Sequence, residues 1–185
     1  MTQDSAQGIA VVTYDPAWPG LYAGERDRIL EAAAGRIVEI EHVGSTAVPG
    51  LRAKPIIDVM AAVADLEVAA RLAADLEVLG YRMVETGMRG RLFLTRQDLA
   101  GGQSYHLHLV ERSGWETRKE RLMRDELLSD PQAVRAYGEL KTQLALLHAH
   151  DGLAYTRAKT AFVQSLVDRA RAARGLPRVD VWEAD

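Results

Sequence analysis

The sequence predicts an α+β fold in which a sheet part is followed by a helical part. Short β-branched runs separated by Gly and Pro recur over about 9–111, and apolar residues at helical spacing continue over about 114–174. No internal repeat or linker-like stretch interrupts the chain. We therefore expect one domain over 1–175 and an irregular tail over 176–185.

Composition indicates an ordinary globular protein and excludes several kinds of site. The chain has 185 residues, of which 48% are hydrophobic and 26% charged, which is enough to form a substantial core. It contains no cysteine, so disulfides and thiolate metal sites are excluded. A net charge of −3 offers no overall electrostatic attraction for nucleic acid, and we expect no nucleic-acid partner.

The sequence also predicts a cytoplasmic protein with no membrane partner. No stretch approaches the roughly 18 consecutive apolar residues of a membrane span. The first residues, Met1–Gln7, lack the basic start and apolar run of a signal peptide. The oligomeric state is left open.

The first predicted elements are a strand, a helix and a second strand. Ile9–Tyr14 is a β-branched run, and the prolines that follow it set a turn. Leu21–Ala34 has helical spacing and is closed by Gly35. Arg36–Val43 returns to strand character.

A loop, a strong strand and a capped helix come next. Gly44–Lys54 carries the glycines and proline of a loop, and Ile56–Val63 is apolar except at one aspartate. Asp65 can accept a backbone hydrogen bond at a helix N-terminus, so we expect a helix from there to about Leu79, ended by Gly80.

Three further strands and three helices complete the prediction. The strands are Tyr81–Glu85, Arg91–Arg96 and Ser104–Glu111, joined by turns that contain glycine. From Trp115 onward the pattern is helical. Breaks at Asp130-Pro131 and Asp151-Gly152 divide it into three helices.

The loop after Val43 has the composition of a phosphate-binding turn. Gly44 permits close approach of the backbone to a ligand, and the hydroxyls of Ser45 and Thr46 can donate to phosphate oxygens. Asp58 lies in the middle of an apolar strand, where a carboxylate must bind a cation or be hydrogen-bonded. The pair suits Mg²⁺-dependent phosphoryl transfer. The alternative, an ordinary turn beside a hydrogen-bonded core aspartate, stays open.

The same segment resembles a known family. Glu41–Leu51 and Lys54–Asp58 closely resemble the GrpB family, a branch of the nucleotidyltransferase superfamily. The likeness continues in Tyr14–Pro16, His106–Glu111 and Lys159–Phe162, so it covers nearly the whole chain in order.

This resemblance implies a nucleotidyltransferase-like mixed sheet with flanking helices. In that superfamily the strand after the Gly-Ser turn carries two carboxylates on one face, and a neighbouring strand supplies a third. Alternation puts Asp58 and Met60 on one face here, so Met60 takes the place of the second carboxylate. A thioether is a poor ligand for Mg²⁺.

A histidine-containing strand offers a second set of metal ligands. Alternation places His106 and His108 on the same face. His42 precedes the Gly-Ser turn and could approach them, with Asp58 as a fourth ligand. Such a set would favour Zn²⁺, Mn²⁺ or Fe²⁺ over Mg²⁺. The alternatives are histidines hydrogen-bonded within the sheet, or histidines that contact substrate phosphate.

Two lysines lie on the apolar stripes of predicted helices. Lys141 and Lys159 can extend along the apolar surface to water, or direct their ammonium groups into a ligand cavity. The resemblance favours a phosphate-binding role for both, and for Lys54 within the motif. Arg124-Asp125 is expected to be a structural ion pair, with phosphate contact by Arg124 as the alternative.

The resulting functional prediction is a nucleotidyltransferase-like protein. It would bind a nucleotide or another phosphorylated small molecule with a divalent metal, Mg²⁺ or Mn²⁺ with Zn²⁺ as the alternative. Asp58 would serve as catalytic residue in transfer of a nucleotidyl or phosphoryl group to a small acceptor. The competing hypotheses are a non-catalytic binding module and a metalloenzyme with His42, His106 and His108 as ligands.

Overall fold

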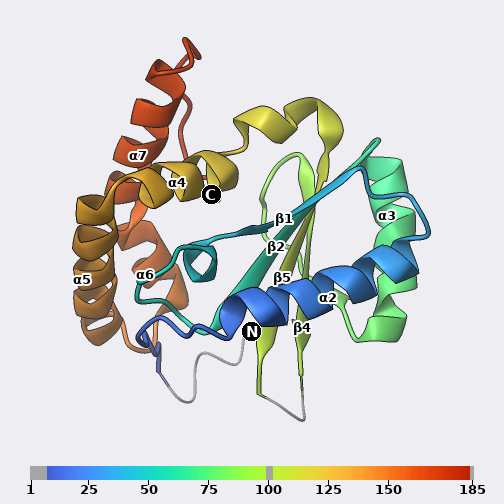
Figure 1. The fold of residues 1–185 in the computed structure, drawn as a ribbon, viewed down its shortest axis with the longest axis horizontal. Coiled ribbons are helices and arrows are strands. Elements are labelled where there is room, and N and C mark those ends of the chain that lie inside the picture. The colour runs from blue at the N-terminus through green and yellow to red at the C-terminus, as the bar shows by residue number, and fades with distance from the viewer. Residues whose placement is uncertain (1–7, 99–101, 184–185) are drawn as a thin grey trace.

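The structure, a computed structural model, describes residues 8–98 and 102–183, and Figure 1 shows its arrangement. Met1–Gln7 and residues 184–185 of the predicted tail lie outside the described residues. The elements of the sheet part are α2 (Trp18–Ala33), β1 (Glu39–Val43), η1 (Ser45–Ala47), β2 (Ile56–Val63), α3 (Leu66–Asp75), η2 (Leu76–Leu79), β3 (Arg82–Met83), β4 (Arg91–Gln97) and β5 (Ser104–Glu111). Those of the helical part are η3 (Arg112–Thr117), α4 (Lys119–Ser129), α5 (Pro131–Leu147), α6 (Gly152–Ala158) and α7 (Thr160–Ala172).

The sheet is mixed, which confirms the predicted α+β class. Its five strands lie in the order β1-β2-β5-β4-β3. The central pair β2 and β5 is parallel, and the other neighbours are antiparallel. In this register Asp58 lies beside His106 and Met60 beside His108. The two strands that the resemblance singled out are therefore neighbours.

One face of the sheet packs in the apolar core, and the other carries polar residues. On one face, Ile57, Val59 and Ala61 of β2 pack against α2 and α3 in the largest apolar core. Alternation sends Asp58 and His106 to the other face. The polar residues of the central strands therefore point away from the core and toward the helical part.

Helices α4 to α7 lie together on one side of the sheet (Figure 1). An apolar cluster joins them to the loop after η1, since Val48 and Leu51 pack with Tyr137 of α5 and Leu166 of α7. Val48 and Leu51 are almost fully buried, so their burial holds this loop against the helices.

The N-terminal elements differ from the prediction. Ile9–Tyr14 forms only an isolated bridge between Val12 and Ala53, so the predicted strand is wrong; this segment meets a loop rather than a sheet edge. The following helix begins at Trp18, because Pro19 occupies its first turn, where no backbone donor is needed. β1 starts at Glu39, since Arg36 instead turns back and donates to the Ala33 carbonyl.

The helical part contains one more α-helix than predicted. Asp130 and Asp151 cap α5 and α6 through their side chains, which confirms both predicted breaks. A further break at Lys159 separates α6 from α7, although no Gly or Pro marks it. Asp65 caps α3, as predicted.

The last described residues, 176–183, form neither helix nor strand, yet Val181 is buried against α4 and α7. Among the described residues, no helix is long and apolar enough to cross a membrane.

Candidate functional site

A pocket of about 220 Å³ lies where the polar face of the sheet meets the helical part. Segments far apart in the sequence contribute to it: the turn after β1, the central strands, α5, and the junction of α6 with α7. Its lining residues are Ser45, Lys54, Ile56, Asp58, His106, Lys141, Tyr155, Thr156 and Lys159. Six of the predicted site residues thus meet in one place, whereas Tyr155, Thr156 and Ile56 were not predicted.

Gly44 shapes the turn that opens the pocket. Its φ of +72° is one that L side chains rarely adopt. A Cβ at this position would meet Asp58 Oδ2 and would lie only 2.9 Å from Asp58 Cγ. Glycine is therefore required by both the conformation and the contact. The close backbone approach that the sequence predicted is an approach to Asp58.

Thr46 lies beneath the pocket and does not line it. Its side chain is fully buried, and Oγ1 donates to the Ile56 carbonyl at 2.9 Å and contacts His42 Nε2 at 3.0 Å. These bonds tie the turn to the start of β2. This corrects the expectation that the Thr46 hydroxyl contacts phosphate; of the two hydroxyls, only that of Ser45 reaches the lining.

Asp58 and His106 form a polar pair on the floor of the pocket. Asp58 Oδ1 lies 3.2 Å from His106 Nδ1, and the two side chains are 26% and 30% exposed. Burial acts to raise the pKa of Asp58, but the hydrogen bond and charge of His106 hold it below its ordinary value. The pocket therefore contains an ionised carboxylate that ligands can reach.

Lysine side chains enter the pocket from the helical part. Lys141 Nζ donates to Ser45 Oγ at 2.9 Å and lies 4.6 Å from the centre of the Tyr137 ring. Lys159 Nζ lies 4.1 Å from the centre of the Tyr155 ring. Both lysines point inward, which is the second of the two orientations that the sequence allowed.

Burial makes both lysines weaker bases than usual. Burial, with a smaller effect of the Lys159 charge, lowers the pKa of Lys141 to about 6. Burial and the charge of Lys54 lower the pKa of Lys159 to about 8. An anion in the pocket would raise both pKa values, because a negative charge favours the protonated amines, and a cation bound with that anion would oppose the rise.

His108 belongs to a different buried cluster. It is 9% exposed, and its Nδ1 lies 3.4 Å from Arg91 Nη1. Arg91 in turn binds Glu120 at 2.6 Å and Glu183 at 3.0 Å. Burial, and to a lesser degree Arg91, lowers the pKa of His108 to about 4, although Glu120 acts in the opposite direction. His108 is therefore a neutral group beneath this cluster and does not line the pocket.

His42 lies on the opposite face of the sheet from Asp58. In the antiparallel register His42 is paired with Val59, and its ring stacks on Tyr22 of α2 at 4.7 Å. This corrects the expected metal set of His42, His106, His108 and Asp58, of which only Asp58 and His106 meet. No group of three or more His, Asp or Glu side chains suited to a metal ion occurs within 8–98 and 102–183.

Met60 and Glu41 occupy the positions next to Asp58 on the polar face. Met60 is fully buried in a small cluster with Val43, Ala62, Val110 and Trp115. Glu41 pairs with Met60 in the register and so points to the same face. The sequence prediction did not include this carboxylate, although alternation along β1 could have indicated it.

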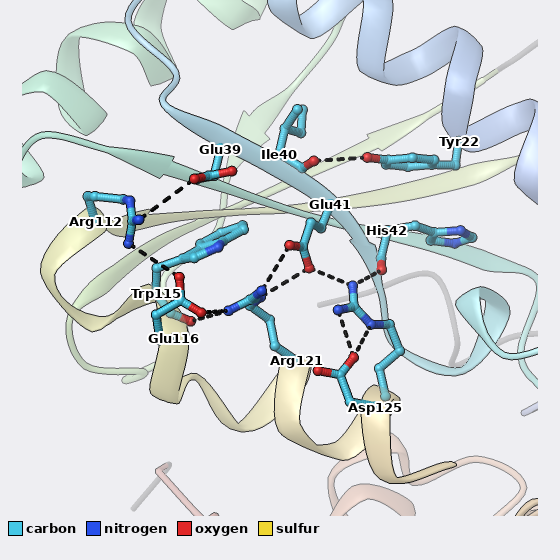
Figure 2. A network of polar contacts seen from close by, with 11 residues as sticks. Tyr22, Glu39, Ile40, Glu41, His42, Arg112, Trp115, Glu116, Arg121 and Asp125 are labelled. Atoms are coloured by element: carbon cyan, nitrogen blue, oxygen red, sulfur yellow. Dashed lines mark hydrogen bonds and ion pairs between the residues drawn. The ribbon is translucent and has the colours of Figure 1, made fainter. Parts of the chain in front are cut away.

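Two arginines of α4, Arg121 and Arg124, bind Glu41. Figure 2 shows Arg121 beside Glu41. Arg121 contacts it at 3.0 Å and Arg124 at 2.6 Å, and Arg124 also pairs with Asp125 at 2.8 Å. Burial opposes ionisation of Glu41, but these hydrogen bonds hold its pKa below the ordinary value. Glu41 is thus bound within a structural network, and Arg124 and Asp125 form the expected ion pair.

Comparison with known proteins identifies the family. The chain matches the GrpB family, described as GrpB protein, over residues 8–169. A UPF0157 protein of Pseudomonas aeruginosa is 38% identical over 174 residues, which cover 92% of this chain and 71% of that protein. The chain belongs to the GrpB family.

Solved structures show the same fold at two levels of similarity. The crystal structure of the conserved protein GrpB from Enterococcus faecalis has a TM-score of 0.78 and 30% identity, and the match covers 90% of this chain and 99% of that one. Terminal uridylyl transferase 4 from Trypanosoma brucei with bound dUTP has a TM-score of 0.53 and 12% identity, over 90% of this chain and 57% of that one. The second likeness concerns the fold alone, and it confirms that this GrpB-family chain has a nucleotidyltransferase-like fold.

Proposed function

We infer that the pocket binds the phosphate groups of a nucleotide or of another phosphorylated small molecule. The observation that carries this proposal is that Lys54, Lys141 and Lys159 line the same small pocket as Ser45, around a single carboxylate. Amines and a hydroxyl donor are suited to phosphate oxygens. The fold supports the proposal, because a protein of similar fold, terminal uridylyl transferase 4, binds dUTP.

A divalent cation would accompany that ligand at Asp58. Mg²⁺ and Mn²⁺ bind hard oxygen ligands, and Mg²⁺ commonly takes one or two carboxylates, with substrate phosphates and water completing its shell. Asp58 fits this requirement, because it is ionised and its side chain is 26% exposed to the pocket. The cation would neutralise phosphate charge. The nearby imidazole of His106 leaves Zn²⁺ as the alternative ion.

Transfer of a nucleotidyl or phosphoryl group to a small acceptor is the catalytic form of this proposal. A binding module without turnover is a second candidate, and the surroundings of Asp58 specifically favour it. Met60 offers no oxygen ligand, and Glu41 is bound by Arg121 and Arg124. Asp58 is therefore without the second carboxylate that the superfamily uses.

Thermal unfolding with ATP and Mg²⁺ or Mn²⁺ tests binding. A ligand at about 100 times its dissociation constant stabilises the native state by about 2.7 kcal/mol. We expect that stabilisation in the unaltered chain and a clear loss in Lys159→Met. Arg71→Gln on α3 removes one positive charge from a surface side chain that is 65% exposed, and it should behave like the unaltered chain. Absence of stabilisation by any nucleotide–metal pair would contradict the proposal.

Asp58→Asn separates the two forms of the function. If the protein is a transferase, product formation is lost in this variant. If it is a binding module, no product forms in either protein, and only the metal-dependent part of the stabilisation disappears. Measurement of product by mass spectrometry alongside the unfolding experiment decides between them.

A further inference from the structure

The contact between Ser45 and Lys141 is a feature that phosphate binding alone does not require. Lys141 is 2% exposed, and its Nζ lies 2.9 Å from Ser45 Oγ. Within the part of the chain that the structure describes, this amine forms no ion pair with a carboxylate. Its other contact is the ring of Tyr137. A buried lysine in such surroundings favours its neutral form.

The charges around the pocket act in the same direction. Lys141 Nζ shares the pocket with the titratable groups Lys54, Asp58, His106, Tyr155 and Lys159. Burial has the largest effect on Lys141, the positive charge of Lys159 adds to it, and the negative charge of Asp58 opposes both. The result is a pKa of about 6, so at neutral pH the Nζ lone pair can accept a proton.

The position of Ser45 is fixed by contacts of its own backbone and of the residues on either side. Ser45 begins η1 directly after Gly44, whose backbone is in contact with Asp58, and its carbonyl accepts a hydrogen bond from Val48 at 3.2 Å. The next residue, Thr46, is anchored to β2. A hydroxyl fixed at hydrogen-bond distance from a neutral amine is the arrangement of a nucleophile and its base.

We propose that Ser45 is a nucleophile activated by Lys141, and that it accepts a phosphoryl or nucleotidyl group from a phosphoric anhydride held in the pocket. This deepens the proposed function and rests on it, because the anhydride is the bound nucleotide. The first acceptor is then a residue of the chain itself, ahead of the small acceptor.

The step is chemically balanced with these groups. A bond forms between Ser45 Oγ and phosphorus, and the bond from phosphorus to the bridging oxygen breaks. The hydroxyl proton moves to Lys141 Nζ. The leaving group is pyrophosphate after nucleotidyl transfer or a nucleoside diphosphate after phosphoryl transfer, and it departs as an anion that Lys159 can neutralise. Protonation of Lys141 places a positive charge beside the phosphorus centre as its oxygens gain negative charge.

A fluorophosphonate probe tests the nucleophile without any assumption about the natural ligand. Ser45 Oγ would bond to its phosphorus as fluoride leaves, and peptide mass spectrometry locates the adduct. We expect labelling at Ser45, with a rate that rises through pH about 6 and then levels off. Ser45→Ala should abolish the adduct, and Lys141→Met should slow labelling by about 100-fold or more.

Lys159→Met provides a readout that a purely structural role would not change. Loss of the Lys159 charge raises the pKa of Lys141, so the midpoint of labelling should move to higher pH. Arg71→Gln, on the surface of α3, should leave the midpoint unchanged. The pH profile of the unaltered chain does not depend on whether any variant folds. Absence of an adduct at Ser45 at pH 8, or labelling no faster than that of exposed serines such as Ser129, would overturn the proposal.

The outcomes also separate this proposal from the one on which it rests. Nucleotide-dependent stabilisation without labelling would leave phosphate binding intact and refute the nucleophile. Labelling of Ser45 without such stabilisation would support Ser45 as a nucleophile and refute nucleotide binding in the pocket. Incubation with a nucleoside triphosphate and Mn²⁺ tests the acceptor role: a mass gain on Ser45 supports it, and an unchanged mass refutes it.

Discussion

Gly44 shows how much a single position can control this pocket. Its backbone has a positive φ and is in direct contact with the Asp58 side chain, so two separate constraints meet at one residue. Gly50, a few residues later, has a similar φ of +79°, but a Cβ added there would meet nothing within 4 Å. The pair allows conformational strain to be separated from steric contact.

Gly44→Ala should destabilise the protein more than Gly50→Ala. The backbone strain costs about 1–3 kcal/mol at either position, and Gly44 is the more restricted because its ψ of −169° lies in a region that essentially only glycine populates. Displacement of Asp58 adds about 1–3 kcal/mol at Gly44 alone. Urea denaturation of the two variants measures the difference. Equal losses would show that the Gly44–Asp58 contact is relaxed at little cost.

Lys141 is expected to lower the free energy of unfolding of the protein near neutral pH. Its pKa falls from 10.5 to about 6 on folding, so between these values the unfolded chain binds a proton that the native state does not. Stability therefore rises with pH over that window. Lys141→Met removes this penalty, and at pH 7 it should stabilise the protein by on the order of a few kcal/mol.

The gain from Lys141→Met should shrink as pH rises toward 10.5, as measured by denaturation at several pH values. Lys119→Met is the matched control, because Lys119 pairs with Glu183 at 3.0 Å and is partly exposed. That variant should be neutral or slightly destabilised. A Lys141→Met protein less stable than the unaltered chain at pH 7 would refute the expected neutral amine.

At the scale of elements, β1 and α4 are joined mainly through one carboxylate. Glu41 of the strand binds both Arg121 and Arg124 of the helix, and Figure 2 shows Arg121 beside it. Its side chain is 26% exposed, and those of the arginines are 15% exposed. Removal of the shared partner leaves two poorly hydrated cations close together.

Glu41→Gln should therefore destabilise the protein by about 1–3 kcal/mol. Glu116→Gln removes a carboxylate that also binds Arg121 but is 68% exposed, so its effect should stay below about 0.5 kcal/mol. Thermal unfolding of both variants, at low and high salt, measures the contrast. Equal effects would indicate that the Glu41 network is as weak as a surface pair.

Local patterns predicted most elements well. β2 and β5 have the predicted bounds, because an apolar core strand and an alternating strand both carry a strong sequence signal. Ile9–Tyr14 failed because β-branched residues favour extension but do not supply a neighbouring strand. The break at Lys159 was not predictable, since its αR backbone differs little from that of a helix interior.

At the scale of the molecule, the pocket depends on contacts that no local pattern encodes. The alternation of side chains along strands correctly predicted that Asp58 and His106 lie on one face of the sheet. The apolar stripes of the predicted helices singled out Lys141 and Lys159, which line the pocket. Ser45 and Lys141, however, are 96 positions apart. The face of the sheet on which His42 lies depends on the register of β1. The burial of His108 depends on Arg91 and its partner Glu183. Neither could be inferred from the sequence.

Ligand binding should consequently stabilise the helical part and the sheet part together. Residues of α5 and α6 line the same pocket as Ser45 and Asp58, so a ligand bound there would contact both parts. We expect slower amide hydrogen exchange in α6 and around Ser45 with ATP and Mg²⁺. α3, on the opposite face of the sheet, is the internal control. Protection confined to the turn would show that the helices take no part in binding.

The burial of Met60 limits how a second carboxylate could be introduced beside Asp58 by mutation. Met60→Asp would place a carboxylate among Val43, Ala62, Val110 and Trp115, where an unpaired charge costs on the order of several kcal/mol. Glu41 could not be recruited without displacing the arginines of α4. A centre with two carboxylates would therefore require changes to α4 before a second acid is introduced.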